Sequence, residues 1–187
     1  GEGSTWSNGS LGAFCMELAE PHTSMLLTYD VIMPSDGPLP TTFLGSTIGV
    51  TKAKYLQELW GRYYDPSWVT SGTFTSKQNS QAGIFAAAIW EIVHEDFTGN
   101  PLDWDVTIDG TLGRKGFYTT EVDSLIANDW LHSLDGTGPM ADLRTFINDG
   151  KQDFLVAVPE PATKALLSIG STFGLLRRKR GLVKENK

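Results

Sequence analysis

The sequence predicts an α+β fold in which a β-sandwich or barrel-like sheet carries inserted helices, with a short hydrophobic helix at the C-terminus. Strand patterns lie early and late in the chain, apolar residues recur at helical spacing in its centre, and twenty glycines indicate many turns. With 187 residues, 40% of them hydrophobic, the chain can form one compact domain. We place this domain at residues 1–157 and a separate tail at residues 158–187.

Short runs rich in β-branched and aromatic residues predict the strands. Residues 11–18 and 25–33 predict two early strands, and residues 152–158 predict a last one. Residues 34–47 contain three prolines and therefore predict a loop. A further short strand is predicted at residues 106–108.

Apolar residues three and four positions apart predict two central helices, at residues 51–64 and 80–94. The second has the stronger pattern, and Ser80 is its expected N-cap. The apolar stripes are Leu56, Leu59, Trp60 and Tyr63 in the first helix, and Ile84, Phe85, Ala88, Ile89 and Ile92 in the second.

Two further helices are predicted in the second half of the chain. Residues 120–133 predict a helix capped by Thr119 or Thr120, and residues 141–148 predict a short one. The expected buried face of the longer helix consists of Val122, Leu125, Ile126 and Trp130.

The net charge of −7 is unevenly distributed along the chain. Residues 162–187 hold seven of the fifteen Lys and Arg residues but one of the twenty-two acidic residues. The preceding 161 residues therefore carry a net charge of −13. Such a body repels nucleic acid, so we expect no nucleic-acid partner, and it attracts divalent cations weakly.

The tail has three consecutive parts. Val158, Pro159, Glu160 and Pro161 form an extended segment that a processing enzyme can reach, because two prolines lie within three residues. An apolar run of twelve residues follows at 165–176, which is shorter than the roughly twenty residues of a stable membrane span. The basic residues after it keep that end cytoplasmic by the positive-inside rule; they are Arg177, Arg178, Lys179 and Arg180.

In the order and spacing of these parts, the tail resembles the PEP-CTERM sorting signals of Gram-negative bacteria. The resemblance implies export, transient anchoring in the inner membrane through the C-terminal helix, and handling by an exosortase-type processing enzyme. It further implies a final location at the cell surface or in the extracellular matrix, commonly alongside exopolysaccharide or a surface protein. The first ten residues lack the apolar run of a signal peptide, so we expect a processed or truncated start.

The domain contains one cysteine, Cys15, and an Ala-Ile-Trp-Glu sequence at residues 88–91. Together they resemble thioester domains of bacterial surface adhesins, in which a cysteine on an early strand is bonded to a glutamine that precedes such a helix motif. The resemblance places that glutamine at Ala86, which has no carboxamide. Gln81 lies five residues earlier, about 7.5 Å back along the helix axis, and is a poor substitute. We therefore expect a body that has lost its thioester.

Two other interpretations of Cys15 stay open. It is a buried small apolar residue, as free cysteines often are, or it still forms a thioester with Gln81 or Gln78 and makes the protein a covalent adhesin. A Cys/His hydrolase would pair Cys15 with a histidine, but none of the three stands in a recognisable nucleophile motif; they are His22, His94 and His132.

We expect no metal and no cofactor. The three histidines lack the spacing of zinc ligands, and the acidic stretch at residues 103–109 lacks the pattern of an EF-hand loop. Glu91 and Glu95 lie four residues apart on a predicted helix, where we expect them to face water. The sequence thus favours an exported, non-enzymatic binding or structural protein, with a covalent adhesin and a secreted hydrolase as alternatives.

Overall fold

The described parts of the chain form one antiparallel sheet and three helices. The computed structural model of the protein describes residues 12–21, 25–39, 47–69, 73–96, 99–110 and 116–158. In chain order, the strands and helices in these ranges are β1 (Ala13–Cys15), β2 (Asp30–Ile32), α1 (Gly49–Tyr63), α2 (Ser76–His94), α3 (Ser124–His132), β3 (Leu143–Asn148) and β4 (Lys151–Ala157). The α+β prediction is therefore confirmed.

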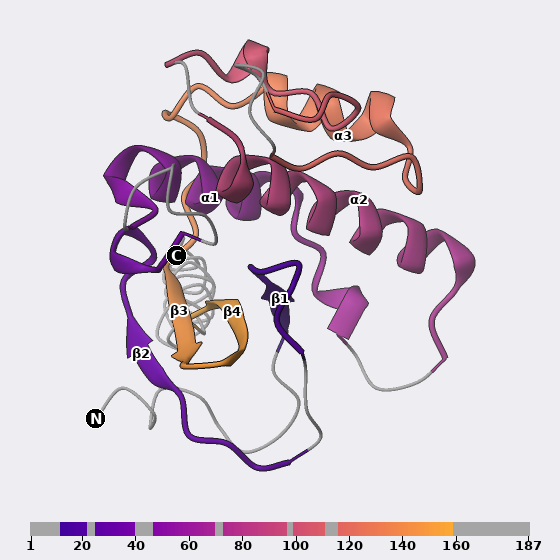
Figure 1. The fold of residues 1–187 in the computed structure, drawn as a ribbon. Helices are drawn as coiled ribbons and strands as arrows, with labels where there is room; N and C mark the ends of the chain where they lie inside the picture. The colour runs from indigo at the N-terminus through magenta and orange to yellow at the C-terminus, as the bar shows by residue number, and fades with distance from the viewer. Residues whose placement is uncertain are drawn as a thin grey trace, which may run out of the picture.

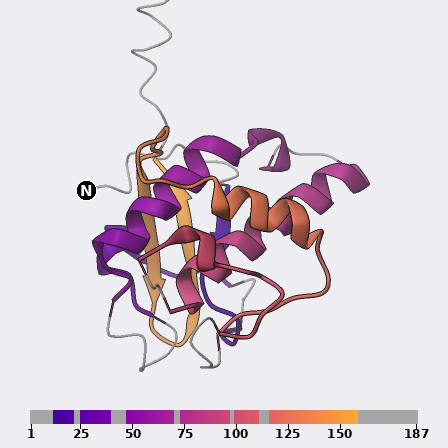
Figure 2. The ribbon, with the colours of Figure 1, turned by 90° about the horizontal axis from the view of Figure 1, so that it is seen from above.

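The elements are stacked in three layers. Helices α1 and α2 lie over one face of the sheet, and α3 lies on the far side of these two helices (Figure 1). Seen from above, the helices pass in front of the strands (Figure 2). The core lies between the sheet and the central helices, where the aromatic ring of Phe14 meets those of Trp60 and Phe85 at centroid distances of 5.6 and 4.9 Å.

The strands form a single open sheet in the order β1-β4-β3-β2, with every neighbouring pair antiparallel. Strand β1 from the start of the chain and β4 from the end of the body are thus direct neighbours, with Cys15 opposite Phe154. The described strands do not form the sandwich or closed barrel that the sequence predicts, because β1 and β2 are left as edges.

The helix predicted at residues 141–148 is wrong, because this segment is β3. Its first four residues alternate between buried and partly buried positions, with Leu143 and Thr145 wholly covered. Gly150 adopts φ 71°, which a tight turn requires and other residues avoid, and the chain then returns as β4. The glycine at the turn and the alternation of buried positions are typical of a strand in a hairpin. The short apolar spacing on which the helix prediction depended is therefore misleading here.

Helix α2 begins earlier than predicted. Thr75, not Ser80, is its N-cap, and its Oγ1 accepts a hydrogen bond from the Gln78 backbone N at 3.2 Å. The Gln78 side chain in turn accepts from the Thr75 backbone N at 2.9 Å, which completes a capping box. The prediction failed because the first turn of α2 is exposed and polar, so no apolar stripe marks it.

Helix α3 differs from its prediction in both cap and face. Its N-cap is Asp123, which accepts from the Ile126 backbone N at 3.3 Å, and not Thr119 or Thr120. The side chain of Leu125, expected in the core, is 78% exposed. Helix α3 begins at Ser124, later than predicted, and buries a narrower face than expected. The buried residues of this face are Ala127 and Leu131.

Residues 106–108 form a turn and not the predicted strand. The Asp105 Oδ1 atom accepts from the backbone N and the Oγ1 of Thr107, at 2.9 and 2.7 Å, and this local bonding replaces a strand ladder. The C-terminal hydrophobic helix predicted at residues 165–176 lies outside the described residues. Among the helices that the structure does describe, none has the length and apolarity needed to cross a membrane.

Candidate functional site

The two sequence features that suggested a thioester-like body, Cys15 and the Trp90 helix, are in direct contact. Cys15 is the last residue of β1, and its carbonyl oxygen accepts a hydrogen bond from the Trp90 Nε1 atom at 2.9 Å. One turn further along α2, the buried His94 Nε2 atom lies 3.0 Å from the Met16 carbonyl oxygen and donates to it. Helix α2 therefore binds the end of β1 through two side-chain donors.

The Cys15 thiol lies on the opposite face of the sheet from α2. Its neighbours Phe14 and Met16 both point into the core between sheet and helices. Side chains alternate along a strand, so the Cys15 side chain lies on the other face, beside its cross-strand partner Phe154. Burial raises the pKa of the Cys15 thiol above its ordinary value, which keeps it protonated and weakly nucleophilic.

No described contact joins Cys15 to a glutamine on α2. Ala86 occupies the position that the resemblance assigns to the bonded glutamine, and it is half-buried. Gln81 lies well inside the regular helix, so the separation of about 7.5 Å along its axis holds. Gln78 belongs to the capping box, and its Nε2 atom donates to the Ser67 carbonyl oxygen at 3.2 Å. Neither Gln78 nor Gln81 therefore offers its carboxamide to the thiol.

The described histidines are likewise engaged elsewhere. His94 lies against the Met16 carbonyl oxygen, and His132 Nε2 lies 2.8 Å from the Trp104 carbonyl oxygen. Burial lowers the pKa of His94, so it is neutral and serves as a donor. His22 lies outside the described residues. The structure thus brings neither of the two described histidines to Cys15 as a general base.

Glu91 and Glu95 do not face water as predicted. Both are almost wholly buried, at 0% and 1% exposure. Glu91 Oε1 accepts from the Asp105 backbone N at 2.9 Å, and Glu95 Oε1 accepts from the Phe117 backbone N at 2.6 Å. Buried backbone N–H groups need acceptors, and these carboxyl groups provide them for the segment that leads to α3. The helical spacing alone could not show this, because the covering segment comes from later in the chain.

Lys52 joins α1 to the same end of α2. Its Nζ atom donates to the carbonyl oxygens of Val93 and Glu95 at the C-terminal end of α2. Burial lowers the pKa of Lys52 to about 8, although nearby acidic groups oppose the shift. Four residues thus form a polar cluster at the C-terminal end of α2: Lys52, Glu91, His94 and Glu95. Because all four are buried, the cluster suits a structural role better than contact with a substrate.

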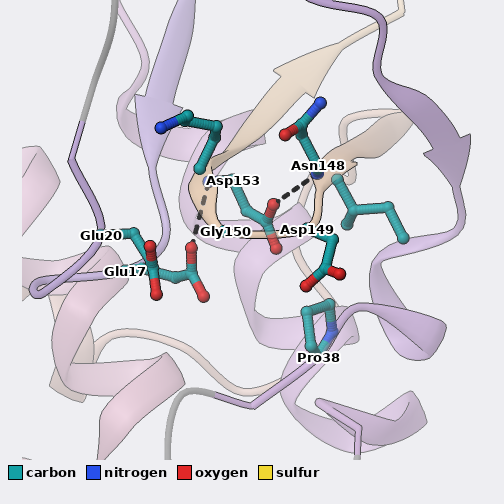
Figure 3. A pocket seen from close by; sticks show the side chains of 9 residues that line it. Glu17, Glu20, Pro38, Asn148, Asp149, Gly150 and Asp153 are labelled. Carbon is teal, nitrogen blue, oxygen red and sulfur yellow. Dashed lines mark hydrogen bonds between the residues drawn. The ribbon is translucent and has the colours of Figure 1, made fainter.

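A separate acidic pocket lies where the β3–β4 turn meets the segment that follows β1 (Figure 3). Its volume is about 310 Å³, and four carboxylates line it, those of Glu17, Glu20, Asp149 and Asp153. Asp153 Oδ1 accepts from the Asn148 backbone N at 2.9 Å, and Glu17 Oε2 accepts from the Asp153 backbone N at 3.2 Å.

Sequence reasoning missed the acidic pocket because its walls come from opposite ends of the body. Glu17 and Asp153 are 136 residues apart and meet only because β1 pairs with β4. The single sequence signal was the strongly acidic body with its weak attraction for cations. Within the described ranges, however, no group of three or more His, Cys, Asp or Glu side chains is arranged to hold a metal ion.

The segment that the sequence predicts to be a sorting motif, residues 158–161, begins where the described body ends. The backbone N of Val158 donates to the Asp142 carbonyl oxygen at 2.8 Å, which extends the sheet by one residue. Its remaining residues, Pro159, Glu160 and Pro161, and the basic residues at 177–180 lie outside the described residues. No protein-family model matches the chain, and comparison with the curated proteins and with the solved structures gives no match.

Proposed function

We propose that the protein is an exported, non-enzymatic protein of the cell surface or extracellular matrix, sorted by its C-terminal tail. The observation that carries this proposal is the three-part sequence at residues 158–180, with its extended proline motif, its short apolar run and its basic end. The position of the motif supports it. Strand β4 ends at Ala157, so the tail starts directly after the last backbone pair of the sheet.

In this proposal the tail acts at the inner membrane. The apolar run at residues 165–176 enters the bilayer as a short helix, and the basic residues at 177–180 hold its end in the cytoplasm. A run this short makes a weak anchor, which suits a protein that is later released. An exosortase-type enzyme then acts at the motif formed by residues 158–161, and the α+β body passes to the surface or into an exopolysaccharide matrix.

The body then serves as a binding or structural unit related to thioester domains without their covalent chemistry. The contact between Cys15 and Trp90 supports the relationship, because it joins the two features on which the resemblance depends. Ala86 and the orientation of the thiol away from α2 speak against a live thioester. The protein would bind its matrix partner without forming a bond to it.

The sorting proposal is tested by producing the full chain, with a secretion signal, in a Gram-negative host that has an exosortase and in the same host without it. We expect surface or medium localisation in the first host and inner-membrane retention in the second. Glu160→Ala should cause retention in both, whereas the control Glu185→Ala, which lies beyond the basic residues, should behave as the parent. Surface delivery of Glu160→Ala at the parental level, read by fractionation and immunoblot, would refute the proposal.

A further inference from the structure

We propose that the tethered body faces the lipid surface with one end of its sheet, the end that carries Asp142 and Val158, and that the acidic pocket faces away from the membrane. The inference rests on the proposed function, because it needs the apolar run at residues 165–176 in the bilayer. It follows from the point where the described body ends, from the short length of chain before the run, and from the charges at the two ends of the sheet.

The chain leaves the body at a fixed point. Strand β4 lies between β1 and β3, and its last residue, Ala157, is opposite Leu143 of β3. The Val158 backbone N then donates to the Asp142 carbonyl oxygen at 2.8 Å. Pro159 has no backbone N–H, so it cannot donate to the next carbonyl oxygen of this ladder. Because β4 has a partner strand on each side, the tail starts from a firmly held end of the sheet.

The tether between this point and the membrane is short. The apolar run begins at residue 165, seven residues after Val158. A fully extended chain covers at most about 3.6 Å per residue, so the tether reaches no further than about 25 Å. Roughly 5–8 Å of this length is needed to cross the headgroup region of the bilayer. The end of the sheet that carries Val158 is therefore held within about 20 Å of the lipid surface.

The acidic pocket lies at the opposite end of the same hairpin. It is built around the β3–β4 turn, where Asn148 is opposite Lys151 (Figure 3). Strand β4 has seven residues, and at about 3.3 Å per residue its two ends are about 20 Å apart. The tether holds only the Ala157 end of this strand close to the lipid, so the pocket end is free to point away from it.

Charge distinguishes a body that stands upright from one that lies on its side. Five charged residues line the pocket end, four of them acidic: Glu17, Glu20, Asp149, Asp153 and the single cation Lys151. At the tethered end Asp142 forms an ion pair with Arg144, and the nearby apolar Met140 is 42% exposed. An anionic lipid surface repels the pocket end but has little effect on a neutral pair. The upright orientation therefore satisfies both the tether and the charge.

The test uses the full chain, purified in detergent from the inner membrane of a host without an exosortase and reconstituted into vesicles of phosphatidylglycerol and phosphatidylcholine. In a Cys15→Ala background, Met140→Cys and Asp149→Cys each carry one fluorescent label, at opposite ends of the sheet and at exposed positions. Lipids with a nitroxide headgroup quench a label that lies close to the membrane. We expect at least about twofold more quenching for Met140→Cys, whose label lies about 20 Å nearer to the lipid. Asp149→Cys removes a repelling charge, so this substitution works against the expected difference.

Unfolding curves show whether each labelled variant is folded, and Asp142→Cys replaces Met140→Cys if that variant is not. The control for the tether is an insertion of about twenty Gly and Ser residues between Val158 and Pro159, which should remove most of the difference between the two labels. Equal quenching at the two positions without the insertion would overturn the orientation, although the tail would still be a membrane anchor. Failure of the full chain to float with the vesicles would overturn both the orientation and the proposed anchoring.

Discussion

Glu91 holds a carboxyl group that water does not reach. Burial raises its pKa to about 9, and the charge of Glu95 adds to the shift, so the group is protonated at neutral pH. Its Oε1 atom still accepts the Asp105 backbone N, which a neutral carboxyl group can do. The residue therefore acts as a buried hydrogen-bonding group and not as a surface charge.

The pH dependence of stability follows from this shift. Between about pH 4.5 and about pH 9 the folded protein binds a proton at Glu91 that the unfolded chain has released, so stability falls as pH rises. Lys52 acts in the opposite direction, but only above about pH 8. In the parent, this titration lowers the free energy of unfolding by up to about 1.4 kcal/mol for each unit of rising pH. We expect Glu91→Gln to lack this decrease.

The measurement is urea unfolding of the parent and of Glu91→Gln from about pH 5 to about pH 7.5, where Lys52 does not contribute. Glutamine retains an oxygen for the Asp105 backbone N, so the variant tests titration and not the loss of a hydrogen bond. Glu121→Gln is the control at an exposed site. Parallel curves for the parent and Glu91→Gln would contradict the assignment.

Cys15 is the residue at which the proposed loss of a thioester can be tested directly. Its carbonyl oxygen is bound by Trp90, but its thiol lies on the other face of the sheet and Ala86 offers no carboxamide. We expect the intact mass of the purified chain to equal that of the plain sequence and to be unchanged by methylamine. Iodoacetamide should modify Cys15 once the chain is unfolded.

A live thioester would give the opposite result. The mass would be lower by one ammonia and would rise on capture of methylamine. Cys15→Ala is the matched control, because it cannot form the bond and should show no response to methylamine. A methylamine-dependent mass increase in the parent alone would establish the covalent adhesin, and fragmentation would then identify the glutamine.

At the scale of the element, α2 organises the body. Its N-terminus is closed by a capping box, and its C-terminal half carries the donors and acceptors that bind β1, α1 and the segment before α3. The same stretch supplies apolar contacts to the core through Phe85, Ile89 and Ile92. One helix thus combines the hydrophobic stripe with several buried polar contacts.

The true start of α2 can be tested with two matched substitutions. Thr75→Ala removes the Oγ1 acceptor of the capping box, and we expect it to lower the free energy of unfolding by about 1 kcal/mol. Ser80→Ala lies inside the helix on exposed surface, where alanine is favourable, and should leave stability unchanged or slightly higher. Denaturant unfolding measures both, and a larger loss for Ser80→Ala would restore the later start.

At the scale of the whole molecule, the charge of the chain changes sign close to where the last described strand ends. The body carries the acidic excess and ends with β4, whereas most of the tail's charges are basic. Leu155 of β4 is wholly buried opposite Phe14 and Thr145, so the last strand is part of the core. The body is expected to be stable without the residues that follow it.

Deletion of residues 159–187 should therefore leave the midpoint of thermal unfolding within about 2 °C of the parent. The same deletion should abolish binding to anionic lipid vesicles, because it removes the apolar run and the basic residues. Deletion of residues 155–187 is the control and should unfold the body by removing half of β4. A large loss of stability in the shorter deletion would show that the tail is part of the domain.

The sequence by itself determined the α+β class, the two central helices and the first and last strands, because these follow from local periodicity. Leu56, Leu59 and Trp60 are buried as their spacing predicts. The stripe of Ile84, Phe85 and Ile92 is buried in the same way. The sequence also determined the charge division and the three parts of the tail, which are properties of composition and order.

Tertiary structure alone decided that Glu91 and Glu95 are buried and on which face of the sheet the Cys15 thiol lies. It also decided that the acidic pocket exists. Each depends on segments far apart in the chain, such as β1 beside β4 or Asp105 over α2. The strand β3 was also decided there, since its short apolar pattern suits either element until a neighbouring strand supplies hydrogen bonds. Local spacing specifies which side of a helix or strand is apolar. Whether its polar side faces water or is buried by a distant segment of the chain depends on tertiary packing.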